Sequence, residues 1–141
     1  MYTYTYPRAA LTVDAIVFVK KQNSVSVLLI ERGREPFKNK WALPGGFIDM
    51  DETLEASCIR ELKEETGLEL DAMEQFRAYD AINRDPRHRT ISVVFAAQLN
   101  KEQAVVGSDD AAQARWFSMN ELPELAFDHA QILADYFAPE F

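Results

Sequence analysis

The sequence predicts a single domain of the mixed α/β class, for three reasons. The chain has 141 residues, a usual length for one compact domain, and we expect that domain to span residues 1–141. Short runs rich in β-branched residues recur along the chain, which favours strands. One segment, residues 52–66, contains no Gly or Pro and is rich in helix-forming residues. Strands interrupted by an inserted helix are typical of a mixed α/β fold.

Strands are expected where such runs are bounded by polar or turn-forming residues. They are residues 11–19, 25–30, 69–79, 90–98 and 114–117. Acidic residues interrupt the third of these runs. Loops are expected at residues 31–40, 83–89 and 100–111. Between the second strand and the helix, residues 41–47 form a short apolar segment interrupted by a Gly-Gly turn.

The ends of the helices follow from capping residues. Gly67 supplies the stop expected after the helix at residues 52–66. Ser118 and Glu121 have the spacing of a capping box, which predicts a brief helix there. Asp128 is placed to cap a last helix that runs to about residue 138.

Composition excludes several classes of partner. The net charge of −8 argues against binding to a nucleic acid polymer, which requires a basic surface to release its counterions. The single cysteine, Cys58, excludes an intramolecular disulfide and fits a reducing compartment. The N-terminus lacks the pattern of a signal peptide, and residues 11–19 are far shorter than the ~20 residues that span a bilayer. We expect a soluble, cytoplasmic protein with no membrane partner.

The candidate chemistry lies in the helix at residues 52–66. At 100° per residue, Glu64 and Glu65 lie about 60° and 40° to either side of Glu61, so three carboxylates share one face. Their repulsion costs a few tenths of a kcal/mol per pair, roughly, and a divalent cation reverses that cost. Oxygen ligands of this kind suit Mg²⁺ or Mn²⁺. Glutamates on a helix are nevertheless more often a solvated face, so these three residues alone do not establish a metal site.

The spacing around this helix is much more specific. Seven residues match the Nudix box, the signature of the Nudix hydrolase family, and two leucines occupy its hydrophobic positions. The seven are Gly46, Glu52, Arg60, Glu61, Glu64, Glu65 and Gly67, and the leucines are Leu62 and Leu68. If each residue type occurs about once in fifteen, such a match arises by chance in roughly one window in 10⁸. Residues 46–68 therefore resemble a Nudix box, and the order of the surrounding elements is similar to a whole Nudix domain over about residues 8–138.

The resemblance implies an α/β/α sandwich around a mixed β-sheet, and hydrolysis of a nucleoside diphosphate linked to another group. By position, it implies metal ligands at Glu61, Glu64, Glu65 and the backbone carbonyl of Gly46. Bound metal neutralises phosphate oxygens and activates a water for in-line attack, so no covalent intermediate is needed. Glu52 belongs to the box too, and its role stays open between support of the ligands and structure.

The catalytic base stays open between the box helix and a later loop. Arg60 precedes Glu64 by four residues and is close enough to hold one carboxylate in position. The base is then Glu64 itself or an acid of the loop at residues 100–111. In that loop Asp109 and Asp110 are preferred over Glu102, and a polar surface turn is an equally good interpretation of the pair.

Two further residue types with catalytic potential are interpreted as structural. Cys58 lies inside the box helix without a partner base, so we expect it to pack in the core. His129 follows Asp128 at the expected start of the last helix, which fits a helix-start residue better than a catalyst.

Two segments resemble one branch of the family, the ADP-ribose pyrophosphatases and the ADP-ribose-sensing Nudix domains of regulators. They are residues 32–47 and residues 84–87. Arg32, Arg84 and Arg87 can clamp phosphate or ribose oxygens, because guanidinium forks suit such groups, and Asp85 lies within the second segment. The alternative is a solvated basic turn. Arg84 also stands where that branch usually has a proline.

The leading hypothesis is hydrolysis of ADP-ribose to AMP and ribose 5-phosphate. Two alternatives stay open: a nucleoside triphosphate pyrophosphohydrolase and a non-catalytic ADP-ribose sensor. Regulators of the sensing type carry a DNA-binding domain after the Nudix fold, for which 141 residues leave no room, so we expect the enzyme. The resemblance also implies a homodimer. Tyr2, Tyr4 and Tyr6 alternate as in an edge strand, which we expect to be buried within the chain or against a dimer partner.

Overall fold

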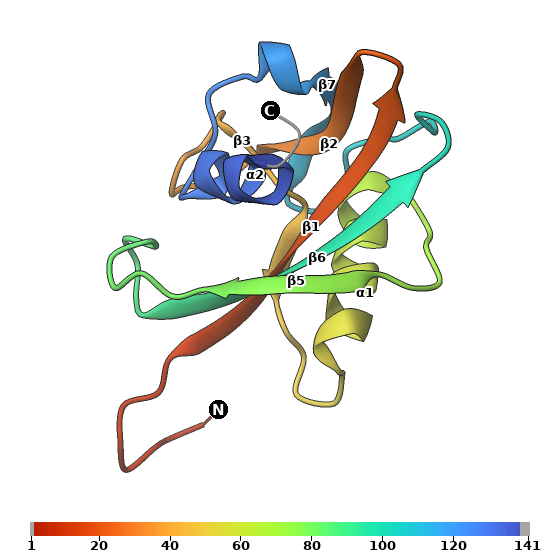
Figure 1. Ribbon diagram of the computed structural model, residues 1–141. Coiled ribbons are helices and arrows are strands. Elements are labelled where there is room, and N and C mark those ends of the chain that lie inside the picture. The colour runs from red at the N-terminus through yellow and green to blue at the C-terminus, as the bar shows by residue number, and fades with distance from the viewer. Residues whose placement is uncertain (1, 139–141) are drawn as a thin grey trace.

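The computed structural model describes residues 2–138 and contains seven strands and two α-helices in that range (Figure 1). The strands are β1 (Ala10–Lys21), β2 (Ser24–Arg32), β3 (Trp41–Ala42), β4 (Gly45–Phe47), β5 (Glu74–Tyr79), β6 (Thr90–Leu99) and β7 (Ala111–Ser118). The helices are α1 (Leu54–Thr66), between β4 and β5, and α2 (His129–Phe137), at the end. A single 3-10 turn, η1 (Met119–Glu121), follows β7.

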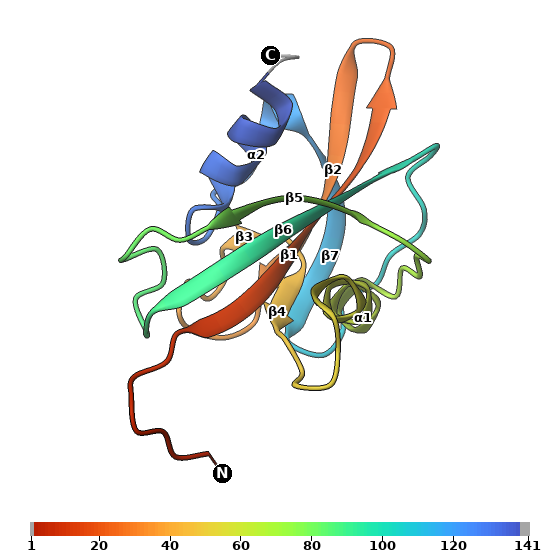
Figure 2. The ribbon, with the colours of Figure 1, turned by 60° about the horizontal axis from the view of Figure 1, so that its bottom comes forward.

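The strands form one mixed sheet with a helix on each side. Its main order is β3-β2-β1-β6-β5, with β4 added to β1 and β7 added to β2. Only β1 and β6 run parallel among these pairings. Figure 2 shows α1 and α2 on opposite faces of the sheet. The α/β/α sandwich around a mixed sheet, which the resemblance implied, is confirmed.

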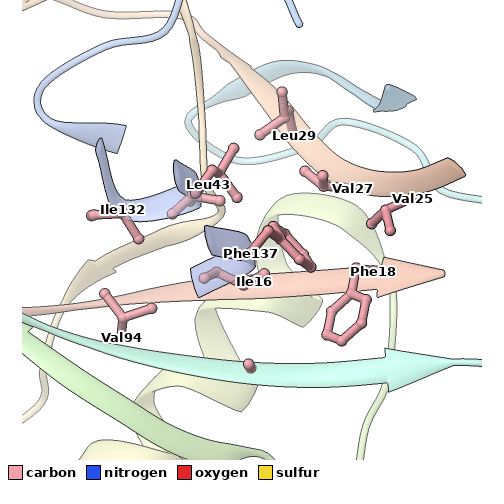
Figure 3. Packing of buried hydrophobic residues seen from close by; sticks show 11 residues of the cluster. Ile16, Phe18, Val25, Val27, Leu29, Leu43, Val94, Ile132 and Phe137 are labelled. Carbon is pink, nitrogen blue, oxygen red and sulfur yellow. The ribbon is translucent and has the colours of Figure 1, made fainter. Parts of the chain in front are cut away.

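The alternation along β1 explains why both faces need a helix. Ile16 and Phe18 point into the cluster under α2, whereas Ala15 and Val17 point into the cluster under α1. All four side chains are buried. Figure 3 shows the cluster under α2, where Ile132 and the last helical residue, Phe137, pack with residues from the strands. A strand that is apolar on both faces requires cover on both, and α1 and α2 provide it.

The helix that carries the acidic residues begins and ends as capping rules predict. The Thr53 hydroxyl accepts a hydrogen bond from the N–H of Ala56, so the helix begins at Leu54, two residues after the predicted start. Gly67 follows in the left-handed conformation with φ 78°, and its N–H donates to the carbonyl of Lys63. The predicted stop at Gly67 is confirmed.

The prediction of the third strand was wrong in its first half. The strand predicted at residues 69–79 begins only at Glu74. Residues 69–73 turn instead, which buries Leu68 and Met73 in the cluster under α1. The N–H of Met73 donates to a carboxylate oxygen of Glu55, so this backbone group is bonded outside the sheet. Burial of two apolar side chains therefore outweighs the strand propensity of the segment.

The prediction of an N-terminal edge strand was wrong. No strand precedes Ala10 in the described residues, and Tyr2 and Tyr6 are 70% and 78% exposed. The rings of Tyr2 and Tyr4 stack on each other, and the Arg8 guanidinium lies over Tyr4. In Figures 1 and 2 this segment extends away from the sheet. An alternating pattern predicts a strand only where a partner strand is within reach.

Of the two caps predicted near the C-terminus, the one at Ser118 is confirmed and the one at Asp128 was wrong. The Ser118 hydroxyl accepts from the N–H of Asn120 at the start of η1, as expected. Asp128 directly precedes α2, but its side chain makes no capping hydrogen bond. Its carboxylate instead accepts hydrogen bonds from the Arg84 guanidinium at both oxygens, a bidentate ion pair.

Candidate active site

The acid cluster, defined as Glu61, Glu64 and Glu65, lies along α1 with Arg60 among its carboxylates. One terminal nitrogen of Arg60 donates to Glu61 at 3.0 Å and to Glu64 at 3.2 Å. The Arg60 Nε donates to Glu52, at 2.9 Å to one of its oxygens. Glu52 also accepts from the Ser57 hydroxyl, which ties the start of the helix to Arg60. The expected contact of Arg60 with Glu64 is confirmed, and Glu52 orients Arg60.

The backbone of β4 lies directly against the acid cluster. The N–H of Gly45 donates to a carboxylate oxygen of Glu65 at 2.8 Å. A Cβ added to Gly46 would lie 2.7 Å from the Glu61 carboxylate, a distance that real Cβ atoms essentially never show. Glycine at position 46 is therefore required for close approach of the backbone to Glu61.

Two carboxyl groups of the acid cluster, those of Glu61 and Glu65, have raised pKa values. Burial raises the pKa of Glu61 to about 7, although Arg60 donates a hydrogen bond to it. Burial likewise raises the pKa of Glu65 to about 8, in spite of the hydrogen bond from Gly45. Desolvation disfavours the charged carboxylate, and a nearby cation reverses that effect. These oxygen donors fit a hard divalent ion in chemistry. In this structure the carboxylates are arranged around Arg60. Within residues 2–138, no group of three or more Asp, Glu, His or Cys side chains lies closely enough together to hold a metal ion.

A pocket of about 530 Å³ opens beside the acid cluster. Gly46 and Glu61 line it on the side of α1. Other predicted site residues that line it are Arg32, Arg84, Asp85, Arg87, Asp109 and Asp110. Of the remaining predicted residues, Arg60 contacts Glu61 and Glu65 contacts Gly45, two residues that line the pocket. Glu64 contacts Arg60. The pocket therefore brings together residues that are more than 70 positions apart in the chain.

The arginine wall, defined as Arg32 and Arg87 with the ring of Phe127, forms another side of the pocket. The Arg32 guanidinium lies 5.0 Å from the centre of the Phe127 ring, and that of Arg87 lies 5.9 Å from it. The Nε of Arg32 donates to the carbonyl of Pro36, which orients the side chain. Asp85 accepts two hydrogen bonds from the Arg87 guanidinium and orients it in turn. Two guanidinium groups are thus held near each other with their remaining donors available to an anion.

Arg84 is held differently from the other two arginines. Its guanidinium donates to both carboxylate oxygens of Asp128, at 2.9 Å and 2.7 Å. The Arg84 side chain is only 4% exposed, compared with 36% for Arg87. Arg84 therefore lines the pocket mainly as a link between the loop before β6 and the start of α2.

The loop before β7 contacts both the acid cluster and the pocket. Asp109 and Asp110 line the pocket, and Asp110 pairs with Arg34 at 2.9 Å. The Ser108 hydroxyl donates to the carbonyl of Glu64, so the loop packs on the last turn of α1. Glu102, the third acid considered as a base, pairs instead with Lys21 at 2.7 Å and does not line the pocket.

Two features of the pocket were missed from the sequence. Phe127 has φ 52°, a conformation that is rare for a bulky residue and that no local pattern predicts. The second feature is the pair of buried polar residues Asp14 and His129, which lie on the pocket wall. Asp14 could have been noticed, because it is an acid inside an apolar strand; that it faces His129 depends on the fold.

Cys58 is buried, and burial raises the pKa of its thiol, in line with the expected packing role.

Comparison with known proteins identifies the family. A family model described as NUDIX domain matches residues 8–136, which is most of the chain. The chain belongs to the Nudix hydrolase family. Its Nudix box runs from β4 through α1, and members of the family generally use divalent metal ions. Neither helix of this Nudix domain within residues 2–138 has the length and apolar character needed to cross a membrane.

Two curated relatives and one solved structure are informative. The Nudix domain is 44% identical over 131 residues to the ADP-ribose pyrophosphatase of Methanocaldococcus jannaschii, covering 93% of this chain and 75% of that protein. It is 34% identical over 137 residues to the ADPR responsive transcriptional repressor NtrR of Acinetobacter baylyi, covering 94% of this chain and 55% of the repressor. The chain thus spans about half the length of the repressor. The NUDIX domain of Shewanella oneidensis NrtR complexed with ADP ribose has a TM-score of 0.88 at 31% identity, covering 96% and 91% of the two chains.

Proposed function

We propose that this protein hydrolyses ADP-ribose to AMP and ribose 5-phosphate with a divalent metal ion. The observation that carries the proposal is that acidic and basic side chains line different sides of one pocket. Glu61 and the Gly46 backbone lie on one side of it, and the arginine wall lies on another. A molecule with two linked phosphates presents anionic oxygens to both sides. The 44% identity to an ADP-ribose pyrophosphatase supports the same substrate.

The acid cluster, together with the carbonyl of Gly46, is proposed to hold the metal, Mg²⁺ or Mn²⁺. When bound, such an ion neutralises phosphate oxygens and lowers the pKa of a coordinated water. Arg60 keeps the Glu61 and Glu64 carboxylates near each other through its shared hydrogen bonds. The proposed base is Glu64, whose side chain is 42% exposed beside Glu61, or else Asp109 or Asp110 from the opposite loop.

The arginine wall is proposed to bind the phosphates of the substrate. Arg32 and Arg87 supply guanidinium donors. The hydrogen bonds that Arg87 donates to Asp85 fix the orientation of its side chain. Arg84 borders the same wall while it binds Asp128. The Phe47 and Phe127 rings both line the pocket and offer apolar faces to a base or a ribose.

Product analysis tests this proposal directly. The purified protein is incubated with Mg²⁺, or with Mn²⁺ in parallel, and offered ADP-ribose, a panel of nucleotide sugars and the nucleoside triphosphates. We expect selective release of AMP and ribose 5-phosphate from ADP-ribose. Release of pyrophosphate from a triphosphate, with ADP-ribose untouched, would instead support the nucleoside triphosphate pyrophosphohydrolase.

A second candidate is an ADP-ribose sensor that binds without cutting. It is favoured by the 34% identity to a transcriptional repressor described as ADPR responsive. Calorimetry with ADP-ribose separates the two functions: a sensor binds with no products after long incubation, whereas the enzyme turns over. The complete acid cluster favours the enzyme, because binding alone does not require three carboxylates on one turn of a helix.

Assembly and location are proposed from the family resemblance and from the state of the cysteine. A homodimer follows from the family resemblance, and light scattering after size exclusion tests it. A cytoplasmic location fits the single buried cysteine, which forms no disulfide. Fractionation of cells that express a tagged chain tests the location.

A further inference from the structure

Three buried polar residues lie side by side in the wall of the pocket, outside the acid cluster and the arginine wall. They are Ser92 on β6, Asp14 on β1 and His129 at the start of α2. All three residues are at most 7% exposed. Burying polar side chains to this extent costs free energy unless they are hydrogen-bonded. The contacts among these three residues therefore stabilise the fold.

The contacts of His129 determine where its proton lies. The N–H of Leu43 donates to His129 Nδ1 at 3.0 Å, so this nitrogen is an acceptor and carries no proton. The remaining nitrogen, Nε2, then carries the proton and faces an oxygen of Asp14 at 3.6 Å. The second oxygen of Asp14 accepts from the Ser92 hydroxyl at 2.5 Å. Nδ1 already accepts from Leu43 and Nε2 carries the proton, so neither nitrogen of this tautomer is free to take a proton from water.

The segment that His129 holds is the one that contacts the acid cluster. Residues 43–46 run from the end of β3 into β4 and are bonded at three successive points. Leu43 donates to His129, the carbonyl of Pro44 accepts from Ala15 at 2.8 Å, and Gly45 donates to Glu65 at 2.8 Å. The next residue is Gly46, which abuts the carboxylate of Glu61. The segment is thus bonded to α2 at one end and to α1 at the other.

The position of the histidine is itself set from two sides. Both carboxylate oxygens of Asp128, the residue before it, accept hydrogen bonds from Arg84 in the loop before β6. The ring of His129 is packed against that of Phe127, with 5.4 Å between centroids. The start of α2 therefore cannot shift without breaking a nearly buried ion pair, and this gives the Leu43 amide a well-defined partner.

We propose that His129 is a positioning residue for catalysis, which acts through residues 43–46 on the distance between the Gly46 backbone and the acid cluster. The side chain does not touch the acids, and its effect passes through the hydrogen bond to Leu43. A core histidine that only satisfied the Leu43 amide would affect stability alone. A positioning residue changes the rate of the chemical step and the affinity for metal. The proposal rests on the proposed function only for its turnover measurement.

Three variants separate positioning from stability. His129→Phe removes the acceptor for Leu43 and keeps an aromatic ring, whereas His129→Asn keeps an acceptor at about the place of Nδ1. Phe137→Leu is the matched control, because it loosens the same helix eight residues further on, about 12 Å along its axis. Each variant is measured for Mn²⁺ affinity without substrate, for kcat and KM with ADP-ribose, and for hydrogen exchange of the Leu43 amide.

We expect His129→Phe to lower kcat and Mn²⁺ affinity by about 10-fold or more, the usual effect of residues that support metal ligands. Its KM should stay within about 3-fold, and the Leu43 amide should exchange faster. His129→Asn should restore most of both losses. Phe137→Leu should lower the melting temperature and leave kcat and Mn²⁺ affinity near the wild type. Should His129→Phe fail to fold, His129→Leu removes the same acceptor with a smaller side chain.

Two outcomes would overturn the proposal. In the first, the variants without an acceptor bind Mn²⁺ and turn over as Phe137→Leu does. In the second, His129→Asn is as impaired as His129→Phe although its Leu43 amide is protected. Failure of the proposed function looks different: the wild type does not cut ADP-ribose, while the Mn²⁺ and exchange measurements still decide the role of His129.

Discussion

The acid cluster and the arginine wall face the same pocket but are built in different ways. The acid cluster comes from a single turn of one helix, and its arrangement follows from residue spacing alone. The arginine wall combines the end of β2, the loop before β6 and the residue before Asp128, which are separated by more than 90 positions. The first is therefore a local property of the chain, and the second exists only in the folded protein. Substitutions in the acid cluster should therefore change mainly kcat, whereas substitutions in and around the arginine wall should change mainly KM or stability.

The largest expected effect is in the acid cluster, on the rate of turnover. Glu64→Gln keeps the size of the side chain and removes its charge, so a proposed metal ligand and candidate base is lost. We expect kcat to fall by about 10³-fold, the upper range for loss of one charge-stabilising group, with an unchanged fold. Glu69→Gln is the control, because Glu69 is exposed and its carboxylate pairs with Lys63 on the surface. Near wild-type activity of Glu64→Gln, measured by AMP release, would remove Glu64 from the site.

A pair of glycine substitutions tests the close approach of backbone to acid. Gly46→Ala places a Cβ against the Glu61 carboxylate and must displace it, so we expect kcat to fall by about 10². Gly67→Ala meets no atom within 4 Å, but its φ of 78° is strained for alanine. That change should cost about 1 kcal/mol of stability, with kcat little affected. Steady-state kinetics and chemical denaturation of both variants check the contrast, and equal kinetic losses would contradict it.

The same division explains which features could be predicted from the sequence. The helix at residues 54–66 and its stop at Gly67 follow from propensity and capping, which are local. The seven box positions identify the acids for the same reason, since their spacing is set by one helix and one turn. The strand predicted at residues 69–79 failed in part, because burial of Leu68 and Met73 draws the segment out of the sheet.

What could not be predicted depends on contacts between distant segments. Nothing around Asp128 distinguishes a helix cap from a partner for Arg84, 44 residues away, and both interpretations use the same carboxylate. The left-handed backbone of Phe127 has no signal in its neighbours. The three arginines look equivalent in sequence, yet Arg84 is nearly buried and Arg87 is one-third exposed.

That difference between the arginines gives the next prediction. Arg87→Ala should raise the KM for ADP-ribose by roughly 10-fold, about 1.4 kcal/mol, because a charged hydrogen bond to phosphate is lost. Arg84→Ala should instead cost about 3 kcal/mol of stability, since it leaves Asp128 without its partner in a mostly buried place. Denaturation and kinetics of the two variants are compared with those of Arg77→Ala, whose side chain is 55% exposed. A KM effect of Arg84→Ala in a protein of unchanged stability would reverse these assignments.

The smallest effect concerns how the arginine wall depends on pH. Burial raises the pKa of Asp85, but the hydrogen bonds from the guanidinium and the N–H of Arg87 outweigh it, so the pKa is lowered overall. A lowered pKa means that this carboxylate stabilises the fold at neutral pH, and that the contribution is lost as pH falls below about 4 through the folded-state value. Asp85→Asn should therefore be less stable than the wild type by about 1 kcal/mol at pH 7, with the difference shrinking towards pH 3. Urea denaturation at pH 7, 5, 4 and 3 measures the difference, and a gap that stays constant over this range would show that Asp85 does not stabilise the fold through its charge.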